Sequence, residues 1–237
     1  MEIAQQVTAY LQHGTVANSV NMPSIPPEMA SLLEPYLTLG RRLGLFLGQV
    51  ESIEPCSVEI AISAEAASLA TAPIVNAALS GLLEKFFASP VNQVNAPVVA
   101  ADRGIDVKEL RSSQRGAYTT LVTLTVTGPG GERDVVAGTL AADRTPRLVR
   151  WGSYELDAHL EGSILVMKNL DRPGVIGSIG TILGQSQINV SRMQMGLDTA
   201  SGEAASLWAL DSDLPHALLD KIRAVRDVKQ AYGVIVA

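Results

Sequence analysis

The stretch NLDRPGVIGSIGTILG, which begins at Asn169, carries residue types that could bind a small zwitterion. Pro173 fits the first turn of a helix predicted over 171–186, and the free N–H groups and positive dipole of a helix start attract a carboxylate. Asn169 and Asp171 supply acceptors for an ammonium group, and Asn189 opens the next predicted strand, where the chain is expected to return to this region. In the alternative interpretation, Asp171 only caps the helix and Asn189 only ends a turn.

Glycines recur at every third position in the same stretch, as Gly174, Gly177 and Gly180. The dinucleotide-binding fingerprint is G-x-G-x-x-G, whereas this sequence has G-x-x-G-x-x-G, so the signature is absent. A spacing of three places the glycines along roughly one helix face, where missing side chains permit a close approach. That face could pack on a sheet or on a second copy of the same helix, or it could contact a phosphate directly.

Other groups capable of chemistry are isolated in the sequence. His13, His159 and His216 are too scattered for a recognisable metal-binding motif, so we expect no metal. The single cysteine, Cys56, excludes a disulfide framework or cysteine-based cluster built from this chain alone, and we expect it to be a small buried hydrophobe. No catalytic constellation is found.

Composition suits an α/β protein with small residues at its packing contacts, since 47% of the 237 residues are hydrophobic and 20 are glycine. The length favours two domains. The net charge is −6 and the basic residues are dispersed, so we expect no nucleic-acid partner. No signal-peptide pattern and no run of about 18 apolar residues is found, so we expect no membrane span and a cytoplasmic location. Trp151 and Trp208 are expected to be core or interface anchors.

Periodicity predicts helices on an antiparallel-rich sheet in the first two thirds of the chain. Helices are expected over 1–14, 28–50 and 71–87, and strands over 57–63, 118–126, 132–140 and 147–156. The segment 94–112 suggests a short helix followed by an extended stretch.

The last third predicts a compact ferredoxin-like βαββαβ unit. The expected strands are 162–168, 188–197, 203–210 and 228–236, with helices over 171–186 and 214–225. Residues 162–237 carry equal numbers of basic and acidic side chains, so the whole net charge lies before them. This difference places a boundary near residue 161.

The block ILVMKNLDRPGVIGSIGTILGQSQINVSRMQMG resembles the ACT domain, a small amino-acid-sensing module, through its D-R-P-G-V-I-G and I-N-V elements. Upstream, the segments VANSVNMPSI, PYLTLGRRLG, VNAPVVAADRGIDVKE and WGSYELDAHLEG resemble the C-terminal regulatory half of long-form D-3-phosphoglycerate dehydrogenases. In that family an intervening, allosteric substrate-binding domain precedes the ACT domain. The resemblance covers essentially the whole chain and implies a helix remnant and linker over 1–20, an intervening domain over 21–160 and an ACT domain over 161–237.

The resemblance also implies an L-serine site at the interface of two paired ACT domains. The residues carried over to this site are Asn169, Asp171 and Asn189, with backbone near Gly174, Val175 and Ile176. Asn169 stands where members of the family often carry a histidine or tyrosine.

A second site implied by the resemblance is an anion site of basic residues in the intervening domain. Arg147 is the best-matched candidate, with Arg144 and Arg150 nearby, whereas Ser153 and Tyr154 replace basic residues of the family. The alternative is that these arginines are solvated surface residues.

The family catalyses the first step of L-serine biosynthesis from 3-phosphoglycerate with NAD, through catalytic domains that this sequence does not contain. The resemblance therefore implies a regulatory fragment that needs no cofactor of its own and does not catalyse by itself. Its expected partners are L-serine, other copies of the chain in a dimer or tetramer, and the catalytic domains. A similar domain pair occurs in bacterial iron-sulfur L-serine dehydratases, but one cysteine cannot supply such a cluster. The alternative function is a structural oligomerisation module that binds no effector.

Overall fold

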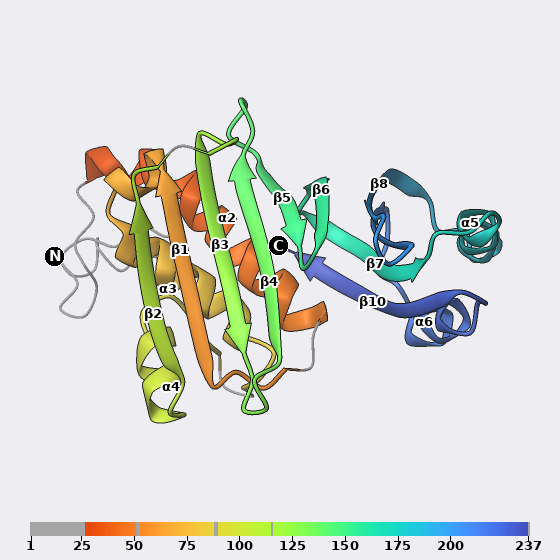
Figure 1. The fold of residues 1–237 in the computed structure, drawn as a ribbon, viewed down its shortest axis with the longest axis horizontal. Coiled ribbons are helices and arrows are strands. Elements are labelled where there is room, and N and C mark those ends of the chain that lie inside the picture. Colours follow the sequence, from red (N-terminus) through yellow and green to blue (C-terminus); the bar gives the residue numbers. More distant parts are fainter. Residues whose placement is uncertain (1–26, 51–52, 88–89, 115, 237) are drawn as a thin grey trace, which may run out of the picture.

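The computed structural model describes residues 27–50, 53–87, 90–114 and 116–236 (Figure 1). Within this part of the chain, two sheets of six and four strands are covered by helices, and most neighbouring strands are antiparallel. The predicted α+β class is confirmed. The predicted helix 1–14 and the whole segment 1–20 lie outside the described residues.

The six-stranded sheet comes from the first two thirds of the chain. Its strands are β1 (Ser57–Ala64), β2 (Asp106–Ser112), β3 (Thr120–Thr127), β4 (Arg133–Leu140), β5 (Pro146–Trp151) and β6 (Tyr154–His159). Their order across the sheet is β2-β1-β3-β4-β5-β6, and only β1 and β2 run parallel. A parallel pair needs a crossover connection, which here contains the 3-10 turn η1 (Glu65–Ser68), α3 (Thr71–Leu83) and α4 (Ala96–Asp102).

One face of this sheet is covered by α2 (Pro27–Val50) and α3 (Figure 1). The helix predicted over 28–50 is confirmed, but its single buried side is wrong for the second half, since residues 43–48 are all buried where α2 packs against α3 as well as the sheet. Leu39, Leu43 and Phe46 are fully buried. Helical spacing of these apolar residues turns one side of α2 toward the sheet, which removes their surface from water.

The backbones of α2 and α3 touch where two glycines meet the facing helix. A Cβ atom on Gly44 would lie 2.1 Å from the carbonyl oxygen of Ala78, and one on Gly81 would lie 2.2 Å from that of Arg41. Real Cβ atoms do not approach a backbone oxygen this closely. The helix packing therefore requires glycine at both positions.

The four-stranded sheet has the predicted βαββαβ order. Its elements are β7 (Gly162–Leu170), α5 (Val175–Gln185), β8 (Val190–Asp198), β9 (Glu203–Leu210), α6 (His216–Arg223) and β10 (Val228–Val236). The strand order is β10-β7-β9-β8, which leaves β8 at one edge and β10 at the other. Both helices cover the same face, where Met167 and Trp208 of the strands join one apolar cluster with Ile179 and Leu183 of α5. The ferredoxin-like prediction is confirmed.

Two predicted boundaries are wrong because a glycine changes the chain direction. The helix predicted over 171–186 begins only at Val175, since Gly174 adopts the left-handed region with φ of 96° and forms the N-cap. Pro173 consequently precedes the helix, and Asp171 does not cap it. Similarly, the strand predicted over 147–156 is two strands, β5 and β6, because Gly152 turns the chain with φ of 57°.

Candidate functional site

Asn169 and Asp171 lie at the end of β7, just before α5 begins. The Asn169 side chain is 5% exposed, and its Nδ2 donates a hydrogen bond to the carbonyl oxygen of Leu170 at 2.7 Å. Asp171 is held by its backbone, whose N–H donates to the Gly202 carbonyl at 3.0 Å. The Asp171 side chain is exposed and has no polar partner among the described residues, so its carboxylate is available to a ligand.

The start of α5, four residues after Asp171, presents backbone donors. Val175 N is 3.5 Å from the Arg172 carbonyl oxygen, and Ser178 N donates to Gly174 at 2.9 Å. The first N–H groups of a helix lack intrahelical acceptors, and the dipole adds positive potential there. Ile176 is 45% exposed on the same turn. A positive backbone terminus and an exposed carboxylate thus lie within a few residues of each other in the chain, which is the combination of charges that a zwitterionic ligand requires.

Asn189 does not join this group within one chain. Strand pairing places Val190 and Ser163 level with each other, both opposite Leu210, whereas Asn169 lies opposite Ala204. The offset of six residues separates the two asparagines by about 20 Å along the strands. The expectation that the chain returns to this region is wrong for a single copy, because β7 and β8 run in the same direction and Asn189 precedes β8.

The glycine face of α5 is open. A Cβ atom added at Gly177, Gly180 or Gly184 would meet nothing within 4 Å. The glycines therefore do not pack on the sheet, which rules out one of the alternatives raised by their spacing.

Beside α5, the edge strand β8 exposes a row of apolar side chains. Met193 and Met195 are each 38% exposed and Leu197 is 49% exposed. They lie opposite Trp208, Ser206 and Ala204 of β9, respectively. Trp208 belongs to the apolar cluster under α5 and α6, so this row lies on the helix side of the sheet. Unpaired edge backbone and adjacent apolar side chains together form a surface suited to another chain.

The three predicted anion-site arginines are not brought together. Arg147 lines a hollow of about 360 Å³ with Tyr118, Thr139 and Asp157 among its walls. Arg144 lies in the β4–β5 turn with φ of 63°, and Arg150 is exposed. Only Arg147 of the three therefore faces this hollow.

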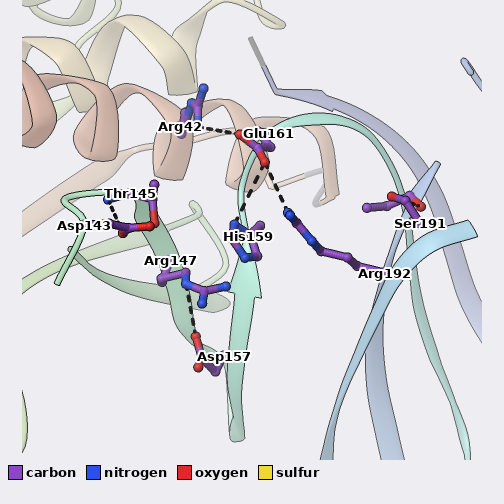
Figure 2. A network of polar contacts seen from close by, with 10 residues as sticks. Arg42, Asp143, Thr145, Arg147, Asp157, His159, Glu161, Ser191 and Arg192 are labelled. Carbon is purple, nitrogen blue, oxygen red and sulfur yellow. Dashed lines mark hydrogen bonds and ion pairs between the residues drawn. The ribbon is translucent and has the colours of Figure 1, made fainter. Parts of the chain in front are cut away.

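A polar cluster next to Arg147 escaped the sequence analysis (Figure 2). Glu161 is 4.0 Å from Arg42 Nη1, 3.9 Å from His159 Nδ1 and 3.4 Å from Arg192 Nη1. Burial, together with the charges of Arg147 and Arg192, lowers the pKa of His159. These side chains come from α2, β6, the link after β6, and β8. No sequence signal unites them, because they are neighbours only after both sheets have formed.

Other groups offer no additional site in the described part of the chain. Cys56 is exposed, contrary to the expectation of burial, because it precedes β1, where its Sγ lies 3.2 Å from the Thr127 carbonyl oxygen. No group of three metal-binding side chains occurs among the described residues. No described helix has the length and apolar character needed to cross a membrane.

Comparison with known proteins identifies relatives for nearly the whole chain. The family model described as the D-3-phosphoglycerate dehydrogenase intervening domain matches residues 32–151. D-3-phosphoglycerate dehydrogenase from Methanocaldococcus jannaschii is 32% identical over 227 residues, which is 96% of this chain and 43% of the relative. The enzymes of the same name from Synechocystis and Bacillus subtilis are 30% and 29% identical over 99% and 96% of this chain. The chain spans 42% and 43% of those two relatives.

Proposed function

The chain belongs to the D-3-phosphoglycerate dehydrogenase intervening-domain family, and from this premise we propose that it is a regulatory unit that binds L-serine and assembles with copies of itself. The unit would act on the catalytic domains of a dehydrogenase in the first step of serine biosynthesis. Feedback requires that serine bind two arrangements of the assembly with different affinity. NAD chemistry belongs to the catalytic domains in this proposal, since the glycines of α5 lack the dinucleotide spacing.

The observation that carries the proposal is the exposed Asp171 carboxylate in the short segment that leads into the start of α5 and its backbone amides. The carboxylate of an amino acid would accept hydrogen bonds from the backbone near Gly174, Val175 and Ile176. Its ammonium would pair with Asp171, a charge-assisted contact. We propose serine as the amino acid because the family resemblance implies an L-serine site and because serine is small enough to bind at the edge of a sheet.

Pairing of two copies would complete the site. If two β8 edges pair antiparallel about a two-fold axis, the beginning of one strand lies beside the end of the other. The Asn189 of a second copy would then approach the end of the sheet that holds Asn169 and Asp171. In this arrangement one ligand would contact Asn169 and Asp171 of one copy and Asn189 of the other, although these side chains lie far apart within a single chain. This pairing would also bury Met193 and Met195.

Isothermal titration calorimetry with L-serine tests this function, with D-serine and 3-phosphoglycerate as controls. We expect saturable binding of L-serine only. Asp171→Ala should weaken it at least about tenfold, because a hydrogen-bonded charge contact contributes about 1.5–3 kcal/mol. The matched control, Asp220→Ala, removes an exposed carboxylate on α6 whose ion pair with Arg223 contributes little, so serine affinity should stay unchanged.

Two outcomes would contradict the proposal. Unchanged serine affinity in Asp171→Ala, with the parent chain binding serine, would exclude the assigned site. No heat at two temperatures, with an oligomer still present, would favour a structural oligomerisation module that binds no effector.

We also propose that the hollow at Arg147 binds a small anion. Arg147 Nε is buried without a hydrogen-bond partner in the described structure, and its distance to Asp157 Oδ1 is 3.6 Å, too long for a hydrogen bond. Arg42 Nε is likewise buried without a partner. Arg192 and His159 contact Glu161 beside Arg147 and do not line the hollow (Figure 2). An anion with several acceptor oxygens would satisfy the Arg147 donor.

Titration with inorganic phosphate at constant ionic strength tests the anion site. We expect Arg147→Gln to weaken phosphate binding about tenfold or more, since one charge-assisted contact is lost. Arg144→Gln removes the same charge from the neighbouring turn, outside the hollow, and should have little effect. Equal losses in the two variants would indicate non-specific attraction by surface charge and contradict the site.

A further inference from the structure

The connection between the two sheets is short and is held by contacts to both sheets, although Glu161 and Gly162 are exposed. β6 ends at His159 and β7 begins at Gly162, so only Leu160 and Glu161 lie between them. Leu160 is fully buried, and Glu161 contacts Arg42, His159 and Arg192 (Figure 2). Domain boundaries usually lie in exposed segments that few contacts cross. The boundary predicted near residue 161 therefore differs from a usual hinge, because contacts to both sheets cross it.

The apolar core continues from one sheet to the other. One buried cluster contains Phe46 of α2 and Leu156 of β6 together with Val166, Leu207 and Val234 of the four-stranded sheet. These last three residues lie on the sheet face opposite α5 and α6, whose own cluster is separate. Separating the sheets would expose this face to water, which is unfavourable in proportion to its apolar area.

Contacts hold both edge strands of the four-stranded sheet against the rest of the chain, at β8 through the face opposite the helices, which leaves its outer edge open, and at β10 through the edge itself. At β8, a Cβ atom on Gly196 would lie 2.2 Å from the carbonyl oxygen of Glu155 in β6, so the two strands touch. At β10, the Gln49 side chain of α2 accepts a hydrogen bond from Ile235 N at 3.0 Å and donates to Ile235 O at 2.9 Å. The amide of Gln49 thus occupies the edge as a neighbouring strand would.

Polar side chains fasten the two sheets at their outer turns. Tyr154 donates to Glu203 Oε2 at 3.1 Å, and the other Glu203 oxygen pairs with Lys229. Burial and the Glu203 carboxylate raise the pKa of Tyr154 to about 12, so its hydroxyl remains a donor at neutral pH. Ser153 Oγ donates to Oδ2 of Asp198, the last residue of β8, at 3.2 Å.

From these contacts we infer that the two sheets form one cooperative body that unfolds and moves as a unit, without a hinge at residues 160–162. The shared core, the touching backbones and the polar contacts lie at different places, so no single bond rotation can separate the sheets. Any ligand or second copy that binds the β8 edge would then stabilise the six-stranded sheet as much as the four-stranded sheet. This consequence rests on the proposed function, whereas the inference itself does not.

The two tryptophans provide one probe for each sheet. Trp208→Phe leaves Trp151 in β5 as the reporter, and Trp151→Phe leaves Trp208 in β9. Each variant is unfolded in urea and followed by tryptophan fluorescence and far-UV circular dichroism on the same sample. In each variant, we expect the urea midpoint measured by fluorescence to agree with the midpoint measured by circular dichroism within about 0.2 M, as in a two-state transition. Separate midpoints, or a plateau between two transitions, would overturn the inference.

Hydrogen exchange supplies an independent test, which holds even if Trp151→Phe fails to fold. Gly196→Ala pushes β8 away from β6, and we expect faster exchange in β3 and β4 as well as in β7 and β9. The matched control, Gly116→Ala, adds a Cβ that meets nothing within 4 Å and should leave exchange unchanged. Faster exchange confined to the four-stranded sheet would show two independent bodies.

Discussion

Gly44→Ala is expected to lower the free energy of unfolding by about 3 kcal/mol or more, because overpacking against backbone atoms cannot be relieved by rotating a side chain. The added Cβ would lie 2.1 Å from Ala78 O and 2.6 Å from Leu82 N, so α2 and α3 would have to separate. Such a loss is a large fraction of the stability of an ordinary domain. Helix propensity alone predicts the opposite sign, since alanine is better than glycine in a helix interior by about 1 kcal/mol.

Urea denaturation followed by far-UV circular dichroism measures this loss. The matched control is Gly184→Ala, which makes the same change in α5, where the new Cβ meets nothing within 4 Å. We expect the control to be neutral or slightly stabilising. If Gly44→Ala and Gly184→Ala changed the free energy of unfolding equally, helix propensity and not the α2–α3 contact would explain the change, and the steric argument would be wrong.

Met195→Lys is expected to convert the assembled protein into particles of lower mass. In the proposed pairing of two β8 strands, Met195 would be buried against the second copy. A lysine there opposes pairing because its ammonium group would be desolvated. Light scattering coupled to gel filtration measures the mass against 25.0 kDa for one chain. We expect the parent chain at twice this mass or more, and Met195→Lys at half the parent value or less.

Loss of assembly should also remove serine binding if the site spans two copies. Val98→Lys is the matched control, since Val98 is 59% exposed on the helix α4, which belongs to the crossover of the six-stranded sheet and not to the sheet that contains β8. This control should retain both the mass and the serine affinity of the parent. A Met195→Lys monomer that binds serine as tightly as the parent would show that one copy contains the complete site, contrary to our proposal.

The sequence predicted the positions of some residues of the candidate site and not of others. Asn169 and Asp171 were expected next to the start of the helix, and they lie there because only a few covalent bonds separate them from it, whereas Gly174 was placed inside the helix and instead forms its N-cap. Asn189 was expected near Asn169 but lies at the other end of the sheet, because its position depends on the direction in which β8 runs relative to β7. The L-serine and anion assignments, and the domain boundary near residue 161, stay predictions.

By itself, the sequence determined the type and order of most elements, including the βαββαβ unit, since hydrophobic periodicity and turn residues act over a few neighbouring positions. Only the tertiary structure decided which distant surfaces meet. It placed Gly44 against Ala78, gathered Arg42, His159 and Arg192 around Glu161, and joined both sheets through one core. Such contacts depend on how complete elements pack in three dimensions, and local residue spacing carries no record of that packing.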